Sequence, residues 1–189
     1  MSLKQAHTAR YIEISVLFSL VLLWTFFSHA PLFAQLRTEY AVKAAFILNF
    51  AMLTRWPETS FSTPDKEMKL CVAGGNELPK SFTSIDGKRV DEKKLHVVEV
   101  VSSTNLSDCD IIFFRKEIKT EDLVRMLNIV REKPVLTIGE KENITRLGGN
   151  IEFYQKQGKL RFAINPSSVA KQGLDVSSRL LKAATLVNN

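Results

Sequence analysis

Short apolar segments in the middle of the chain alternate with stretches of helical periodicity, and this alternation limits the possible folds most strongly. The apolar segments span residues 68–73, 95–101, 110–114 and 134–138, and the clearest helical stretch spans residues 121–132. Strands separated by helices favour a mostly parallel sheet, because each crossover places a helix on one face of the sheet. We therefore predict an α/β fold with a doubly wound-like sheet flanked by helices.

The pattern changes in the last third of the sequence. Residues 150–155 and 159–165 alternate apolar and polar side chains around Gln157-Gly158, which predicts a C-terminal antiparallel hairpin. Residues 177–187 then carry the apolar stripe of a closing helix. No repeat or linker interrupts residues 38–189, so this stretch is predicted to form a single domain.

A very apolar helix is predicted before the first strand, from Thr38, which can cap it, to about Trp56. Pro57 ends it, because proline disfavours helical geometry in the residue before it. Between residues 44 and 53 only Asn49 is polar. Such a helix must be buried on most sides, either in its own core or against another protein.

The first 34 residues have the layout of a cleaved export signal. Lys4 and Arg10 precede an apolar run from Ile14 to Phe27, and the segment ends in small residues before Gln35. This run is shorter than the roughly 20 apolar residues that cross a bilayer, which favours cleavage over a permanent anchor, the alternative interpretation. In both cases we expect the rest of the chain to work outside the cytosol.

The charge pattern argues against a nucleic-acid partner. The whole chain has a formal net charge of +6, of which residues 1–34 contribute +1. The other charges occur in short mixed runs such as 91–94 and 131–133, without the clustered basic stripe that a nucleic-acid groove requires. The basic excess is interpreted as an aid to solubility or as a weak attraction to anionic membrane surfaces.

Cys71 and Cys109 are the only cysteines of the chain. In an oxidising compartment, two thiols favour one disulfide. If the strand at 110–114 lies beside the strand at 68–73, as in a doubly wound order, a strand spacing of about 4.8 Å permits the bridge. The alternative is two separate buried thiols that serve as small apolar side chains.

Few residues suit catalysis or metal binding. His96 is the only histidine beyond residue 34, so we predict no enzyme activity, no metal site and no cofactor. The stretch 74–81 differs from a phosphate-binding loop signature because Pro79 replaces a glycine and removes an amide donor. The triplet Gly74-Gly75-Asn76 still follows a strand at its carboxyl end, and Asn76 is predicted to cap a short helix that runs to about Ile85. A small ligand could bind at this helix start.

A series of short motifs follows in order along the chain. They are the apolar helix at 40–50 with Trp56-Pro57 after it, Leu70 to Gly74, Cys109 to Phe113, Pro134 to Ile138, Gly148 to Phe153, Arg161 to Asn165 and Ser178 to Ala184. Each motif is short, but together they extend over essentially all of residues 38–187. This series resembles the YfiR family of exported bacterial regulators.

The resemblance implies a non-catalytic regulator in the periplasm. Such a regulator binds the periplasmic sensory domain of an inner-membrane diguanylate cyclase and represses it, which lowers cyclic di-GMP and biofilm formation. The resemblance also implies that Cys71 and Cys109 form the family's disulfide between the first and third strands. A homodimer is a further form of association that we keep open.

Binding a partner protein requires exposed apolar surface. The candidate partner-binding residues are Trp56 at the helix end, and Leu174 and Val176 before the last helix, whereas Phe46 and Phe50 are expected in the core. The alternative function comes from another class: a periplasmic module that binds a small anionic or aromatic ligand near Gly74-Gly75.

Overall fold

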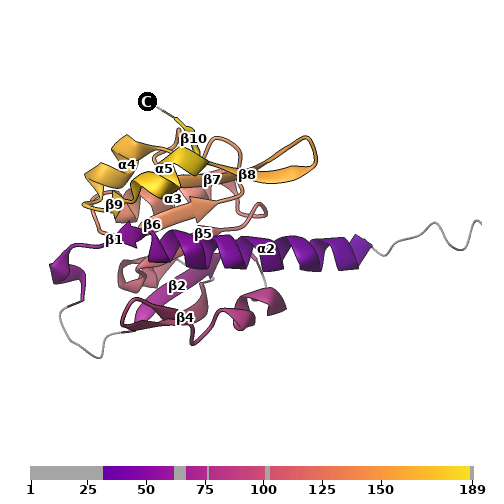
Figure 1. Ribbon diagram of the computed structural model, residues 1–189, viewed down its shortest axis with the longest axis horizontal. Helices are drawn as coiled ribbons and strands as arrows, with labels where there is room; N and C mark the ends of the chain where they lie inside the picture. The colour runs from indigo at the N-terminus through magenta and orange to yellow at the C-terminus, as the bar shows by residue number, and fades with distance from the viewer. Residues whose placement is uncertain (1–31, 62–66, 76, 101–102, 188–189) are drawn as a thin grey trace, which may run out of the picture. The chain divides into compact units, whose positions relative to one another are not determined.

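A curled, mostly parallel sheet forms the centre of the fold (Figure 1). The computed structural model describes residues 32–61, 67–75, 77–100 and 103–187, and residues 39–189 group as one unit, to which the account below refers. Within the described residues the sheet has eight strands: β2 (Met68–Ala73), β3 (Arg89–Val90), β4 (Lys93–Val100), β5 (Ile111–Phe114), β6 (Leu136–Gly139), β7 (Ile151–Lys156), β8 (Lys159–Ile164) and β10 (Thr185–Leu186).

The strand order is β10-β8-β7-β6-β5-β2-β4-β3. The first long strand, β2, therefore lies between β4 and β5 and runs parallel to both, as in the predicted doubly wound order. The predicted hairpin is confirmed in part. β7 and β8 pair antiparallel, but β7 also continues the parallel sheet beside β6, and β10 adds a parallel strand to β8.

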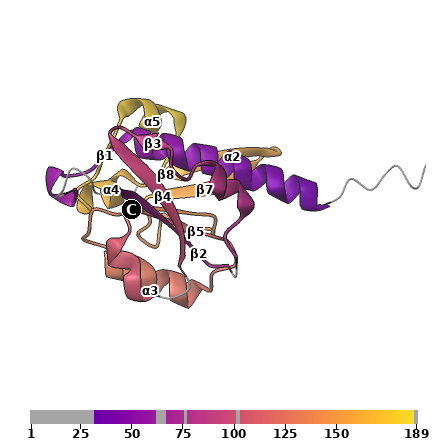
Figure 2. The same ribbon diagram turned by 90° about the horizontal axis from the view of Figure 1, so that it is seen from below.

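Helices cover both faces of the sheet (Figure 2). The α-helices are α2 (Leu32–Met52), α3 (Thr120–Val130), α4 (Pro166–Lys171) and α5 (Ser178–Ala183), and the 3-10 helices are η1 (Glu58–Ser60), η2 (Lys80–Ser84) and η3 (Ser103–Asp108). From Tyr40 onward, α2 packs with α5 on one face, in a core that includes Ile47, Phe50 and Leu180. α3 covers the other face through Leu123 and Leu127.

Aromatic rings join α2 to the β7–β8 pair. Phe50 is 1% exposed, and its ring centroid lies 4.8 Å from that of Phe162 and 5.6 Å from that of Phe153. Phe46 contacts the same two rings. The apolar character of this helix is thus used largely inside its own domain.

The helix boundaries differ from the prediction at two places. α2 begins at Leu32, so Thr38 lies inside the helix and does not cap it, because no helix-breaking residue occurs between them. The helix also ends at Met52, before Trp56, because after Leu53 the chain forms β1 (Thr54–Arg55), which pairs antiparallel with β9 (Asp175–Val176).

The closing helix is shorter than predicted. α5 ends at Ala183, and the residues that would continue it form β10, whose Leu186 is paired with Ile164 of β8. The apolar stripe predicted for residues 177–187 is therefore divided between a helix and an edge strand. A strand partner in the sheet outweighs the helical periodicity of so short a segment.

The Gly148-Gly149-Asn150 motif has a structural role, which depends on the buried side chain of Asn150. Its side chain is fully buried, and its Oδ1 accepts hydrogen bonds from the Thr137 backbone N–H at 2.7 Å and from the Thr137 hydroxyl at 2.9 Å. Gly148 has a φ of 105°, which a side chain would disfavour. The motif holds the start of β7 against β6 and serves the fold.

A helix that crosses a bilayer must be long and apolar over most of its length. In the described part of the chain, no helix is long and apolar enough to cross a bilayer.

Candidate functional site

Two charged residues stand at the carboxyl ends of the central strands. Arg115 directly follows β5, and Glu140 directly follows β6, the parallel strand beside it. Doubly wound sheets commonly bind ligands at the carboxyl ends of their strands. α2 passes the carboxyl ends of these strands and contributes Tyr40 and Lys43, which contact Arg115 and Glu140. We call these four residues, Tyr40, Lys43, Arg115 and Glu140, the Lys43 cluster.

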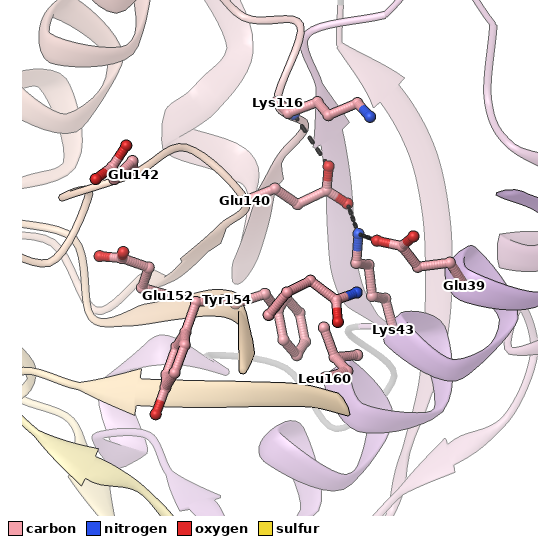
Figure 3. A pocket seen from close by; sticks show the side chains of 10 residues that line it. Glu39, Lys43, Lys116, Glu140, Glu142, Glu152, Tyr154 and Leu160 are labelled. Carbon is pink, nitrogen blue, oxygen red and sulfur yellow. Dashed lines mark hydrogen bonds and ion pairs between the residues drawn. The ribbon is translucent and has the colours of Figure 1, made fainter. Parts of the chain in front are cut away.

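The ammonium of Lys43 lies between the carboxylates of Glu140 and Glu39 (Figure 3). Its Nζ lies 2.8 Å from Oε1 of Glu140 and is also paired with Glu39, one helical turn earlier. The side chains of Lys43 and Glu140 are only 7% and 5% exposed. Oε2 of Glu140 accepts a hydrogen bond from the Lys116 backbone N–H at 3.1 Å. A buried ammonium is therefore neutralised by two carboxylates, and one of these also orders the residues after β5.

Opposing effects act on the pKa of Lys43. Burial alone would lower the pKa of its ammonium, but the hydrogen bonds and charges of Glu140 and Glu39 outweigh burial and raise the pKa above its ordinary value. Lys43 is therefore a charged residue at every physiological pH.

Tyr40 lies between two cations. Lys43 Nζ is 5.1 Å, and the Arg115 guanidinium carbon 5.3 Å, from the centre of the Tyr40 ring, distances suited to cation–π attraction. The Arg115 Nε also donates a hydrogen bond of 3.3 Å to the Tyr40 hydroxyl. Burial raises the pKa of that hydroxyl, and the Arg115 hydrogen bond opposes the rise. Tyr40 is thus fixed as a neutral phenol.

A cavity of about 360 Å³ opens beside the cluster (Figure 3). Its walls include four carboxylates, from Glu39, Glu140, Glu142 and Glu152, two ammonium groups, from Lys43 and Lys116, and the apolar surfaces of Phe153, Tyr154 and Leu160. A polar small molecule with an apolar part fits such walls. Since Glu140 and Lys43 satisfy each other, neither is available as a general base or nucleophile.

Sequence reasoning missed the Lys43 cluster. The available signal was a charged residue immediately after each of two apolar strands, Arg115 and Glu140. Tyr40 and Lys43, three positions apart at the start of the apolar stretch of the helix, were the matching signal on α2. Only the strand order shows that all four meet.

The predicted small-ligand site at Gly74-Gly75 lies next to the cluster. A side chain at Gly75 would overlap the guanidinium of Arg115, which donates a hydrogen bond of 3.2 Å to the carbonyl of Glu77 and pairs with Glu117 at 3.4 Å. Asn76 lies outside the described residues. The predicted helix from Asn76 to Ile85 is wrong: only η2 forms, after Pro79, so no α-helix N-terminus is available to an anion here.

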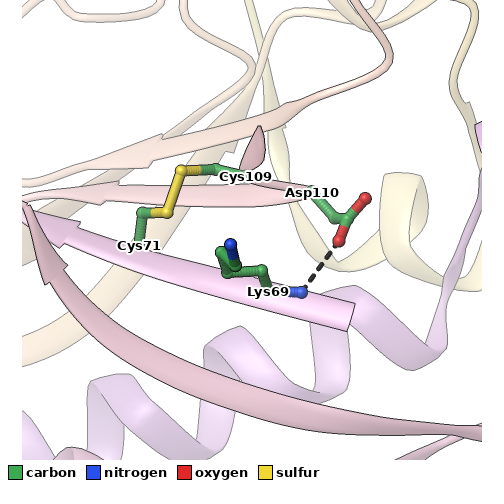
Figure 4. Close-up of a disulfide and its surroundings, with 4 residues drawn as sticks. All are labelled: Lys69, Cys71, Cys109 and Asp110. Atoms are coloured by element: carbon green, nitrogen blue, oxygen red, sulfur yellow. Dashed lines mark hydrogen bonds between the residues drawn. A yellow bond between two sulfur atoms is a disulfide. The ribbon is translucent and has the colours of Figure 1, made fainter. Parts of the chain in front are cut away.

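A disulfide joins Cys71 on β2 to Cys109, which precedes β5 (Figure 4). The two Cα atoms are 5.9 Å apart, and 38 residues separate the cysteines in the sequence. Next to the bridge, Asp110 accepts a hydrogen bond of 2.8 Å from the Lys69 backbone N–H, and its own N–H donates to the Lys69 carbonyl. The start of β5 is therefore tied to β2 both covalently and by hydrogen bonds.

The structure brings the three candidate partner-binding residues together through the β1–β9 pair. Trp56 follows β1, is partly buried and packs against Phe61. Leu174 and Val176 are only 5% and 7% exposed, because their side chains point into the core. These two residues do not supply the exposed apolar surface that the prediction assumed. The exposed groups here belong to Arg55 and Asp175, 88% and 74% exposed.

His96 and the acidic residues show no metal-binding arrangement. His96 is half exposed on β4, with its Nδ1 3.4 Å from Asp86. Among the described residues, no group of three or more histidine, cysteine, aspartate or glutamate side chains is placed to hold a metal ion.

The fold and the cluster define an α/β protein with a disulfide-tied parallel sheet and a polar cavity at the carboxyl ends of its central strands. A family model described as YfiR/HmsC-like matches residues 40–185, and the chain belongs to this family. A comparison with curated proteins finds no match.

Among solved structures, one partial likeness is the ABC domain from Streptococcus pneumonia in complex with L-Trp. It is 11% identical, with a TM-score of 0.42, and the match covers 64% of this chain and 55% of that chain. At this level the likeness says nothing about function.

Proposed function

We propose that this protein is an exported, non-catalytic regulator that binds the periplasmic domain of an inner-membrane diguanylate cyclase and represses it. The observation that carries the proposal is the match to the YfiR/HmsC-like family over residues 40–185. Repression would lower cyclic di-GMP and, with it, biofilm formation.

Two properties of the chain support this proposal. The layout of residues 1–34 is that of a cleaved export signal, which leaves residues 38–189 as a single periplasmic domain. The Cys71–Cys109 disulfide suits an oxidising compartment. In addition, the charged side chains of the Lys43 cluster are engaged within the protein, Lys43 with Glu140 and Arg115 with Glu117 and Tyr40.

The surface around the β1–β9 pair is our candidate for partner contact. Trp56 remains part of it, as a partly buried ring at its base. Leu174 and Val176 support it from the core, and the exposed groups on it are Arg55, Asp175 and Met52, the last of these 44% exposed at the end of α2. Methionine and arginine are both enriched on protein-binding surfaces.

The test compares cyclic di-GMP in a deletion strain that carries either the wild-type gene or Met52→Glu. We expect the wild-type gene to lower cyclic di-GMP and Met52→Glu to leave it near the deletion level, because a carboxylate buried in the interface weakens binding at least about tenfold. Leu147→Glu is the matched control: Leu147 is 36% exposed and lies outside the β1–β9 pair.

Two outcomes of this comparison are decisive. If deletion leaves cyclic di-GMP unchanged in cells that express the cyclase, the proposed function is wrong. If the two variants repress equally well, the β1–β9 surface is not the contact.

The cavity beside the Lys43 cluster favours a second candidate function, a periplasmic small-ligand-binding module. A screen of small amines, carboxylates and aromatic compounds should then find a ligand that raises the melting temperature of the protein by several degrees. The rise should be reduced in the double variant Lys116→Ala, Glu142→Ala, which alters the cavity wall without removing the buried ion pair. A screen without any such shift removes this candidate.

A further inference from the structure

The basic excess of the chain is concentrated at its end. Residues 35–152 contain equal numbers of basic and acidic side chains, whereas residues 153–189 contain six basic side chains and only one acidic side chain, Asp175. The net charge of the predicted mature chain therefore arises entirely in its last 37 residues. A distribution this uneven creates a directional field around the protein.

The β7–β8 hairpin gathers half of these cations on one face. Lys156 is paired with Lys159, and Tyr154 with Arg161, across the antiparallel strands. Opposed residues, and residues two apart on a strand, point to the same side of a sheet. The three cations therefore share one face, and all three are exposed. We call Tyr154, Lys156, Lys159 and Arg161 the basic hairpin face.

The opposite side of the hairpin is used by the core. Phe153 and Phe162 point that way and pack against Phe46 and Phe50 of α2. The hairpin is thus anchored through its apolar side, and the basic hairpin face is presented to solvent by strands that are rigidly held. In Figure 1 the turn of the hairpin extends to the side of the sheet.

The cations of this face lack counter-charges within the described part of the chain. Neither Lys156, Lys159 nor Arg161 forms an ion pair there. The nearest acid along β7 is Glu152, whose carboxylate already accepts hydrogen bonds from the Thr145 hydroxyl and the Asn143 backbone N–H. The charges of Lys156, Lys159 and Arg161 are therefore available to an anionic partner outside the molecule.

A shallow groove continues the surface toward the chain end. It has a volume of about 330 Å³ and is lined by Lys156, Arg161 and Tyr154 on the hairpin and by residues 183–185. On β10, Thr185 faces this groove, and its hydroxyl lies 2.7 Å from that of Tyr154. The groove is lined mainly by polar groups, and its apolar lining is limited to Phe162, Ala183 and Ala184.

We propose that the basic hairpin face binds the anionic phospholipid headgroups of a membrane. Long, exposed Lys and Arg side chains without an ion-pair partner can bind the many mobile phosphates of a lipid surface. Specific binding of an acidic protein would instead require shaped pockets on this face. Membrane binding of this kind goes beyond the proposed function; it would hold the protein near a membrane-bound partner and raise its local concentration there.

The test uses the mature chain recovered from its native compartment and vesicles that sediment with bound protein. We expect binding to vesicles of phosphatidylglycerol mixed with phosphatidylethanolamine, falling as NaCl rises, and none to phosphatidylcholine vesicles. Each cation near an anionic surface contributes about a fivefold gain in binding, so the triple variant Lys156→Gln, Lys159→Gln, Arg161→Gln should bind roughly 100-fold more weakly.

The matched control makes the same charge change at the other edge of the sheet. Lys88→Gln, Arg89→Gln, Lys94→Gln removes three exposed cations near β3 and should reduce vesicle binding by much less. Equal losses in both triple variants would mean that only net charge matters and would overturn the proposal. So would equal binding to neutral vesicles, or binding to soluble polyglutamate or inorganic phosphate without binding to vesicles. These readouts involve no cyclase, so they can fail while the proposed repression stands.

Discussion

The Glu140→Ala variant should lose about 3 to 5 kcal/mol of its free energy of unfolding, because the change leaves the ammonium of Lys43 buried with Glu39 as its remaining carboxylate partner. It also removes the acceptor of the Lys116 backbone N–H. The measurement is urea-induced unfolding at pH 7, followed by circular dichroism and compared with the wild type.

Two further variants control this prediction. Glu142→Ala removes an exposed carboxylate from the wall of the same cavity and should change stability by less than about 0.5 kcal/mol. The double variant Lys43→Met, Glu140→Leu removes both buried charges and should recover most of the loss. A Glu140→Ala protein within about 1 kcal/mol of the wild type would show that the pair does not hold α2 to the sheet.

The pH dependence of this stabilisation follows from the raised pKa of Lys43. A group whose pKa is higher in the folded than in the unfolded protein stabilises the fold fully below its unfolded pKa, about 10.4 for lysine. That contribution is lost as the pH rises through the folded pKa. The advantage of the wild type over Glu140→Ala should therefore be constant from about pH 7 to pH 9 and should decrease only above about pH 10.

Loss of the disulfide should be the other large effect. The double variant Cys71→Ala, Cys109→Ala is expected to lose about 3 to 4 kcal/mol, since a bridge across 38 residues restricts the unfolded chain by about that amount. Both cysteines are nearly fully buried, so small cavities add to the loss. Urea unfolding again gives the value.

Reduction provides the internal control for the disulfide. A reductant should destabilise the wild type to a similar extent and leave the double variant unchanged. If the reductant lowers the stability of both proteins equally, or of neither, the bridge does not supply the stabilisation assigned to it.

Local patterns predicted the central strands well. The apolar runs at 68–73, 110–114 and 134–138 correspond to β2, β5 and β6 within two residues at each end. The order of the first three strands was expected only on the condition of a doubly wound sheet, and in the structure β2 does lie between β4 and β5. The family resemblance also came from such local runs, and the family match bears it out.

Segment ends and exposed faces were predicted less well. Residues 184–187 have helical periodicity, yet Thr185 and Leu186 pair with β8, and the stretch from Asn76 to Ile85 yields only η2. Leu174 and Val176 were expected at the surface, but pairing of β9 with β1 turns both side chains into the core. The results for β10 and β9 depend on a strand partner that is distant in the sequence.

By itself, the sequence determined the α/β class, the central strands and the family, because all three depend on the kinds of residue that succeed one another along the chain. Only the tertiary structure decided that Tyr40, Lys43, Arg115 and Glu140 form one buried cluster, and that the unpaired cations of the hairpin share one exposed face. The physical reason is that burial and charge pairing depend on distances between segments far apart in the chain, and hydrophobic periodicity carries no information about those distances.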